Sequence, residues 1–241
     1  MFGKGFFLGA AVLTICCGTL TATASEKNRG ADEYRVAAEQ GDAEAQFRLG
    51  ACYADGVGVP KDVKQALKWY RKAAEQGNPQ AQLVLGACYI EGAGVPKDEK
   101  LAAEWYRKAA EQGLDKAQFA LGACCFNGTG VPKDEKIAAE WFRKAAEQGH
   151  AGAQLVLGAC YIEGAGVPKD AKLAAQWFDK AVPGLRRAAE QGDAEAQFHL
   201  GECYAYGYGV PKDGKLAVKW YRQAAERGFE PAQKALWDLK N

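Results

Sequence analysis

The sequence predicts an all-α fold: an α/α solenoid of tandem helix-turn-helix repeats, about 36 residues each, wound into a right-handed superhelix. The first observation is a recurring AAEQG motif, whose glycines are Gly41, Gly77, Gly113, Gly149 and Gly192, with Gly228 ending the variant AAERG. Successive glycines are 36, 36, 36, 43 and 36 residues apart. Five tryptophans and five cysteines keep the same spacing with the same single irregularity: Trp69, Trp105, Trp141, Trp177 and Trp220, and Cys52, Cys88, Cys124, Cys160 and Cys203.

Each repeat contains two stretches with helical periodicity. In repeat 1 the apolar residues of the two stretches recur at three- and four-residue spacing: Ala45, Leu49, Cys52 and Tyr53, then Ala66, Trp69, Tyr70, Ala73 and Ala74. Asn78 before Pro79 is a typical start of a first helix, and Asp62 can cap a second helix. Gly77 and its equivalents fit the left-handed residue that closes a helix. We therefore expect two capped helices in every repeat.

The repeats define the domain boundaries. We expect a solenoid over residues 31–241, with repeats at 42–77, 78–113, 114–149, 150–192 and 193–228. Residues 31–41 match only the second helix of a repeat, and residues 229–241 match only the first. The array is therefore predicted to begin and end on single helices.

The N-terminal segment has the features of a secretion signal. Lys4 gives a basic start, Gly5–Gly18 is apolar, and Ala22-Thr23-Ala24 offers the small-x-small pattern that a signal peptidase needs. We predict a signal peptide over residues 1–24 and a periplasmic or secreted mature chain without stable membrane insertion. A lipoprotein is the alternative, because Cys16 and Cys17 follow Leu13-Thr14-Ile15, although the residue before each cysteine fits lipid attachment poorly.

Composition narrows the function classes. Lys and Arg total 31 against 30 Asp and Glu, so the balanced charge gives no electrostatic reason to bind nucleic acid. The chain has only two histidines, His150 and His199, and a single serine, Ser25. His199 and Cys203 lie four residues apart on one predicted helix, but two ligands do not make a metal site. We expect no cofactor, no metal and no catalytic residue.

The repeat A-x-x-x-L-G-x-x-Y-x-x-G-x-G-V-x-x-D-x-x-x-A-x-x-W-[YF]-x-K-A-A-x-x-G resembles the Sel-one-like repeat, an α/α relative of the tetratricopeptide repeats. The resemblance covers the chain from about Ala31 to its end. It implies a scaffold or adaptor that binds a protein or peptide along a concave face lined by the first helices. Two features depart from the pattern: Cys125 replaces the usual tyrosine, and repeat 4 carries seven extra residues.

The resemblance also raises an enzyme alternative, because cysteine-rich relatives have been assigned penicillin-binding or β-lactamase activity. Those relatives pair cysteines within one repeat, and this chain lacks the second cysteine in every repeat. Equivalent positions on packed helices are about 8–10 Å apart, beyond the ~7 Å that a disulfide tolerates. We therefore expect the repeat cysteines to be buried thiols, and we expect no β-lactam hydrolysis because Ser25 lies outside the repeats.

Positions that vary among otherwise similar repeats are the candidate partner-binding residues. They are Arg48 and His199 in one column, Ile90, Phe126 and Ile162 in a second, and Asp55, Glu91, Asn127, Glu163 and Tyr206 in a third. Apolar side chains among carboxylates suit a groove for a peptide or helix. Sealing the core is an equal alternative for Ile90 and for Ile162.

The extra residues of repeat 4 fall in Asp179–Arg187, DKAVPGLRR. Pro183-Gly184 is expected to interrupt the second helix, because proline removes a backbone donor and clashes with the preceding turn. The helix would then overhang or kink and present Arg186 and Arg187.

Overall fold

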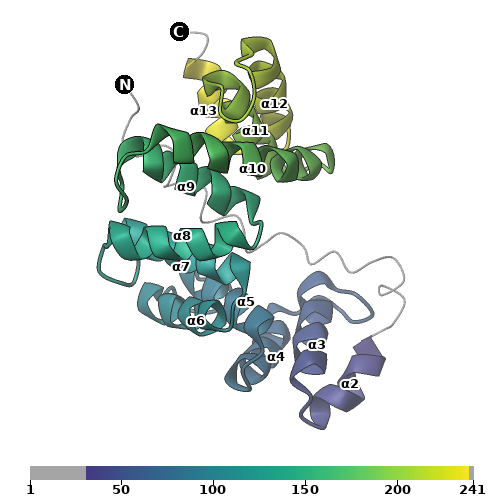
Figure 1. The fold of residues 1–241 in the computed structure, drawn as a ribbon. Coiled ribbons are helices and arrows are strands. Elements are labelled where there is room, and N and C mark those ends of the chain that lie inside the picture. The colour runs from purple at the N-terminus through teal and green to yellow at the C-terminus, as the bar shows by residue number, and fades with distance from the viewer. Residues whose placement is uncertain (1–30, 239–241) are drawn as a thin grey trace. The chain divides into compact units, whose positions relative to one another are not determined.

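The computed structural model describes residues 31–238, and its regular structure there is entirely helical (Figure 1). Twelve helices follow one another in this part of the chain: α2 Ala31–Glu39, α3 Ala43–Asp55, α4 Val63–Glu75, α5 Pro79–Glu91, α6 Glu99–Glu111, α7 Asp115–Asn127, α8 Glu135–Glu147, α9 Ala151–Glu163, α10 Ala171–Glu190, α11 Ala194–Tyr206, α12 Gly214–Glu226 and α13 Glu230–Asp238. Each repeat contributes two helices, and α2 and α13 are single. The predicted all-α architecture of helix pairs is confirmed.

The predicted signal peptide, residues 1–24, lies outside the described residues, as do Cys16, Cys17 and Ser25. None of the helices within residues 31–238 combines the length and the apolar character that crossing a membrane requires.

The helices begin and end where the sequence places caps. Asn78 Oδ1 accepts a hydrogen bond of 2.8 Å from the Ala81 amide at the start of α5, and Asp62 Oδ1 accepts one of 2.9 Å from the Lys64 amide at the start of α4. Gly56 closes α3 with φ 75°, a left-handed conformation that favours glycine. Local sequence therefore determines the helix boundaries.

The described residues fall into two compact halves. The N-terminal half comprises residues 31–124 with 128–132, and the C-terminal half comprises residues 125–127 with 133–238. Within the first half α2 packs on α3, α3 on α4, α4 on α5, and α5 on α6. Within the second half α8 packs on α9, and the same neighbour packing continues to α13. Each helix thus buries its apolar face against its neighbours in the chain.

A glycine and an aromatic ring join the two helices of a repeat. A Cβ atom built on Gly86 of α5 would lie 2.6 Å from Cε1 of Tyr106 on α6. The same closeness recurs where the rings of Tyr70, Phe178 and Tyr221 meet Gly50, Gly158 and Gly201. Only a residue without a side chain lets the ring approach this closely.

Buried glutamines join successive repeats through hydrogen bonds. Gln46 Nε2 donates to the Ala38 carbonyl at 3.0 Å, and the equivalent glutamines donate to Ala74, Ala110, Ala146 and Ala189. In repeats 1 and 2 the side-chain oxygen is also satisfied, because Gln76 donates to Gln46 at 2.7 Å and Gln112 donates to Gln82 at 2.8 Å. The five buried glutamines thus form a ladder of hydrogen bonds, each to the helix that precedes its own.

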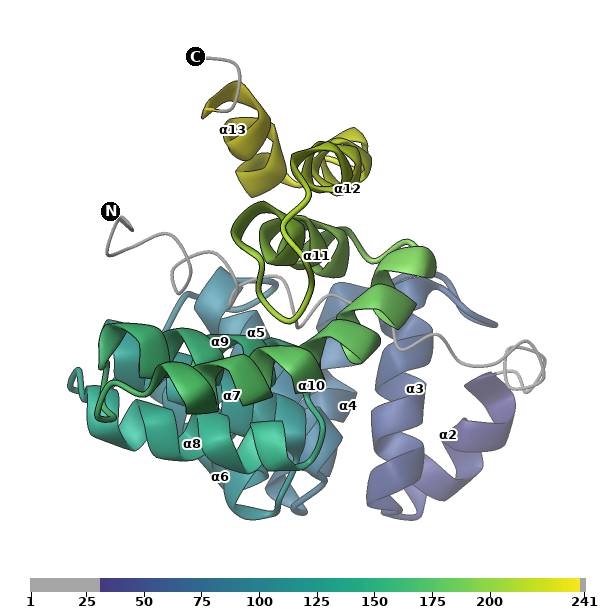
Figure 2. The same ribbon diagram turned by 45° about the horizontal axis from the view of Figure 1, so that its top comes forward.

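The insertion in repeat 4 lengthens a helix instead of breaking it. The helix α10 runs through 20 residues with Pro183 inside it, so the predicted interruption is wrong (Figure 2). Ala181, Val182 and Leu185 are buried on either side of the exposed proline. Their packing offsets a helix-interior cost of about 3 kcal/mol for proline. Arg186 and Arg187 are exposed as expected, and Arg186 Nη2 donates to the Tyr204 hydroxyl at 3.0 Å.

Candidate functional site

The repeat cysteines occupy the core as thiols. Cys52, Cys124, Cys160 and Cys203 are buried, as is Cys125, whereas Cys88 is half-buried. Burial, followed by the charges of Glu163 and Glu135, raises the pKa of Cys160 to about 12. Burial and the charge of Glu202 likewise raise the pKa of Cys203 to about 12. Because the thiolate is the nucleophile, these two sulfurs are inert at neutral pH and contribute packing.

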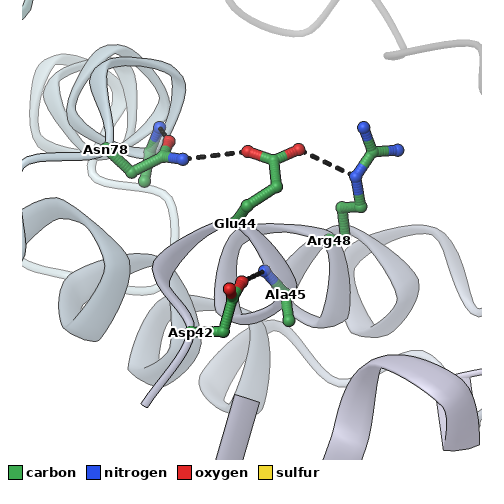
Figure 3. A network of polar contacts seen from close by, with 6 residues as sticks. Asp42, Glu44, Ala45, Arg48 and Asn78 are labelled. Atoms are coloured by element: carbon green, nitrogen blue, oxygen red, sulfur yellow. Dashed lines mark hydrogen bonds and ion pairs between the residues drawn. The ribbon is translucent and has the colours of Figure 1, made fainter. Parts of the chain in front are cut away.

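In the N-terminal half, Arg48 belongs to a polar network that connects two repeats (Figure 3). Its Nε lies 2.8 Å from Glu44 Oε1, and Asn78, the cap of α5, donates from Nδ2 to Glu44 Oε2 at 3.1 Å. Glu44 thus links the first helices of repeats 1 and 2. Asp55 and Glu91 are exposed, whereas Ile90 is only 9% exposed and lies in the core.

In the C-terminal half, the candidate residues range from half-buried to exposed. Phe126 and Ile162 are half-buried, and Lys133 Nζ lies 5.5 Å from the centroid of the Phe126 ring. Asn127 and Glu163 are exposed, and Tyr206 exposes 49% of its surface. Of these side chains, Tyr206 offers a partner the largest exposed aromatic surface.

Repeat 5 contains a buried charged pair, of which the comparison of repeats singled out only His199. His199 Nδ1 lies 2.8 Å from Glu202 Oε2, and His199 Nε2 lies 3.7 Å from Glu195 Oε1. Burial alone would lower the pKa of His199, but the two carboxylates outweigh it and raise this pKa to about 10. His199 therefore lies inside the repeat, so it can affect a partner only through its neighbours.

Cys203, four residues after His199, is not among the contacts of His199 in this network. Glu202 was missed, although it stands where the other repeats have Ala51, Ala87, Ala123 and Ala159. Within residues 31–238, no group of three or more His, Cys, Asp or Glu side chains could hold a metal ion. His150 caps α9 by accepting a hydrogen bond of 3.1 Å from the Ala153 amide at Nδ1.

Two tyrosines form the surface feature that distinguishes repeat 5. The ring centroids of Tyr206 and Tyr208 are 5.6 Å apart, and Tyr208 stacks on the buried Phe178 at 4.2 Å. Tyr208 was not among the predicted residues. It occupies the middle of the Gly-x-Gly connector, where the other repeats have Val57, Ala93, Thr129 and Ala165. We call Phe178, Tyr206 and Tyr208 the aromatic cluster.

Carboxylates adjoin the aromatic cluster. Burial, with the charges of Glu202 and Asp238, raises the pKa of Tyr206. Burial and nearby groups that include Tyr206, Glu202 and Glu163 raise the pKa of Tyr208 to about 12. Both hydroxyls therefore stay protonated at neutral pH and can donate hydrogen bonds. An aromatic surface with hydroxyl donors and an acidic surround suits recognition of another polypeptide.

Comparisons with known proteins agree with the repeat architecture. A family model described as Sel1 repeat matches residues 43–78, 79–114, 115–150, 151–182 and 194–229. A search of curated proteins found no significant match.

Two solved structures are similar in sequence as well as in fold. A Sel1 repeat protein from Oxalobacter formigenes is 39% identical with a TM-score of 0.65, over 86% of this chain and 82% of that one. A protective antigen present in uropathogenic Escherichia coli, which displays an SLR fold, is 36% identical with a TM-score of 0.64 over 87% of this chain. The match covers 51% of the antigen, so this chain spans about half its length. A putative Sel1 repeat protein from Klebsiella pneumoniae, at 22% identity and a TM-score of 0.53, shares the fold.

Proposed function

Because the chain belongs to the Sel1 repeat family, we propose that it is a non-catalytic scaffold that binds a protein or peptide along the face lined by its first helices. The observation that carries this proposal is the aromatic cluster, in which Tyr206 is exposed and Tyr208 is half-buried. Tyr206 and Tyr208 stand where repeats 2 and 4 have Glu91 with Ala93, and Glu163 with Ala165. Exposed aromatic side chains are the residues that most often anchor interfaces.

The enzyme alternative has no support from the arrangement of side chains. A serine β-lactamase or penicillin-binding mechanism needs a reactive serine beside a lysine. The sole serine, Ser25, lies outside the described residues. The thiols of Cys160 and Cys203 are held protonated by burial. The matched family is a repeat family, and no catalytic family was matched.

We also propose that the chain is exported to the periplasm or beyond. Residues 1–24 carry the basic start, the apolar segment and the small-x-small site of a signal peptide. The similar protein from uropathogenic E. coli is described as a protective antigen. N-terminal sequencing of the protein from a periplasmic fraction tests this step. An intact Met1 would contradict it.

Partner binding is tested by using the chain as bait and measuring the amount of each protein that it captures from envelope extracts. Two variants change residues of the aromatic cluster to those that other repeats carry at the same positions. Tyr206→Glu and Tyr208→Ala each introduce a side chain that repeats 2 and 4 already carry at that position, so the fold should persist. We expect a partner captured by the wild type to fall at least about tenfold with either variant, because losing an aromatic anchor costs about 2 kcal/mol or more. The control is Leu173→Ala, which changes a side chain of α10 that is 36% exposed.

Equal capture by Tyr206→Glu and the wild type would show that the aromatic cluster is not the binding surface. Turnover of a chromogenic β-lactam by the purified chain would contradict the non-catalytic proposal.

A further inference from the structure

A second feature of repeat 5 lies outside the aromatic cluster. A cavity of about 550 Å³ opens where the end of α10, the start of α11 and the last turns of α12 meet, all within the C-terminal half. This volume lies in the range of small-ligand sites. The side chains that matter for the argument are Glu190, Gln197, Trp220, Gln223, Glu226 and Arg227.

The tryptophan of this cavity lacks the close cation that its equivalents have. In repeats 1 to 4 a lysine ammonium lies 4.0–4.5 Å from the ring centroid of the repeat tryptophan, in the pairs Lys72–Trp69, Lys108–Trp105, Lys144–Trp141 and Lys180–Trp177. In repeat 5 Gln223 takes the place of that lysine. The cation recorded at Trp220 is Lys219 Nζ, farther away at 5.7 Å. The position about 4 Å from the ring, which a lysine ammonium occupies in repeats 1 to 4, is therefore favourable for a cation from another molecule.

A buried hydrogen-bond acceptor in the same cavity has no partner. Gln197 is 4% exposed and donates from Nε2 to the Ala189 carbonyl at 3.0 Å, but its Oε1 accepts no hydrogen bond. Thirty residues after Gln46 and Gln82 the donors are glutamines, whereas thirty residues after Gln197 the residue is Arg227. The Arg227 guanidinium lies against Gly192, with Nη2 2.8 Å from where a Cβ would be. A buried acceptor of this kind favours a ligand that donates.

The charges around the cavity also favour a cation. Glu190 and Glu226 contribute two carboxylates against the single guanidinium of Arg227, so the lining is net negative. A group that satisfies all three features must donate hydrogen bonds, carry a positive charge and fit beside an indole ring. The ammonium that repeats 1 to 4 supply from their own lysine meets these conditions.

From this convergence we propose that the cavity binds a primary alkylammonium group, whose N–H bonds reach Gln197 Oε1 while its charge faces Trp220 and the two glutamates. The group is supplied either by a lysine side chain of another polypeptide or by a free alkylamine. This site is separate from the aromatic cluster and goes beyond the proposed scaffold function. Repeat 5 would then bind an ammonium group from another molecule, whereas repeats 1 to 4 supply this group from their own lysine.

The test is a titration of the full chain, with the indole N–H signals followed by NMR and the Trp220 signal assigned with Trp220→Phe. The probes are Nα-acetyl-lysine amide, its Nε-acetylated form, and cadaverine. We expect saturable shifts of the Trp220 signal with the first probe and at least about tenfold weaker binding of the acetylated form. Binding of acetyl-lysine amide assigns the site to lysine side chains, and saturable binding of cadaverine alone assigns it to free amines.

Two variants revert the cavity to the residues of other repeats. Gln223→Lys restores the internal lysine, and Arg227→Gln restores the donor to Gln197, so each should weaken binding at least about tenfold while the thermal midpoint confirms folding. The matched control is Gln65→Lys, the same substitution at an exposed position of α4. The proposal would be overturned if neither acetyl-lysine amide nor cadaverine gave saturable shifts. It would also be overturned by equal binding of the acetylated probe, or by undiminished binding to folded Gln223→Lys.

Discussion

At the scale of single residues, the ionisable pair His199 and Glu202 replaces apolar side chains of other repeats. Val84 and Val156 occupy the histidine position, and alanines occupy the glutamate position. His199 and Glu202 are 6% and 3% exposed. Removing one partner of such a pair leaves a buried charge that costs about 3–5 kcal/mol, whereas replacing both by apolar residues is often neutral or stabilising.

We therefore predict that His199→Val alone destabilises the chain by several kcal/mol, and that adding Glu202→Ala recovers most of the loss. The double variant carries the residues of repeats 2 and 4, which the fold accommodates. Urea unfolding at pH 7 measures the free energy of unfolding of each variant. A double variant less stable than His199→Val would contradict the predicted recovery.

The same pair predicts how stability depends on pH. The pKa of His199 is raised from 6.5 to about 10 in the folded chain, mainly by Glu195 and Glu202 acting against burial. Burial also raises the pKa of Glu202 from 4.5, opposed by His199. Both raised values mean that the folded chain holds protons more tightly than the unfolded chain. The contribution of His199 is thus complete below pH 6.5 and is lost as pH rises through 10. As pH rises from 7 to 10.5, the urea midpoint should therefore decrease more for the wild type than for the double variant.

The residues of the site could be predicted from the sequence where one repeat departs from the residue type that the other repeats share. Tyr206 emerged in this way because its column otherwise holds Asp, Glu and Asn. Tyr208 and Glu202 stand in columns of mostly small residues, and the same comparison could have found them. That His199 points inward could not be read from the sequence, because its equivalents differ in exposure: the Arg48 side chain is 41% exposed, Val84 is half-buried and Val156 is buried.

At the scale of helices, the close contact between a first helix and a second helix depends on the glycine beside the aromatic ring. The contact recurs at Gly50, Gly86, Gly158 and Gly201, each facing a tyrosine or phenylalanine. A β-carbon at Gly86 would also lie 3.2 Å from the Ala102 carbonyl oxygen. Because this second contact is with the backbone of α6, movement of the Tyr106 ring alone would not relieve it. Helix propensity favours alanine over glycine by about 1 kcal/mol, but overpacking costs about 1–3 kcal/mol.

We predict opposite effects for two glycine-to-alanine substitutions inside helices. Gly86→Ala should lower the free energy of unfolding by about 1–2 kcal/mol. Gly214→Ala, at the first position of α12 with nothing within 4 Å of the added Cβ, should raise it by up to about 1 kcal/mol. Denaturant unfolding of the two variants measures both effects. Stabilisation by Gly86→Ala would show that the two helices separate without cost.

Helix existence and helix boundaries were predictable because each boundary carries its own cap residue. Asp62, Asn78 and Gly56 act within a few residues of where they stand. The helix α10 was not predictable in this way. A proline inside a helix argues for a break, and only the burial of Val182 and Leu185 against other parts of the C-terminal half keeps the helix continuous. Tertiary packing outweighed the local signal there.

At the scale of the whole chain, packing is organised along the sequence. Among residues 31–238, the helix pairs that pack extensively are neighbours in the chain, from α2 with α3 to α12 with α13. The described residues fall into two compact halves, each with its own core. In such an array stability is nearly a sum of repeat and neighbour terms, so a local defect should weaken nearby repeats most.

We therefore predict that Leu85→Ala destabilises the chain locally. Leu85 is fully buried in α5, and truncation of a buried leucine costs about 2–5 kcal/mol. Hydrogen exchange followed by mass spectrometry should show faster exchange in α4 to α6, while amides of α11 and α12 keep their wild-type rates. Val63→Ala, in the same half but 44% exposed, is the control and should leave all rates within experimental error. A uniform acceleration over every helix would mean that the two halves unfold as one cooperative unit, and the repeats would then be coupled beyond their neighbours.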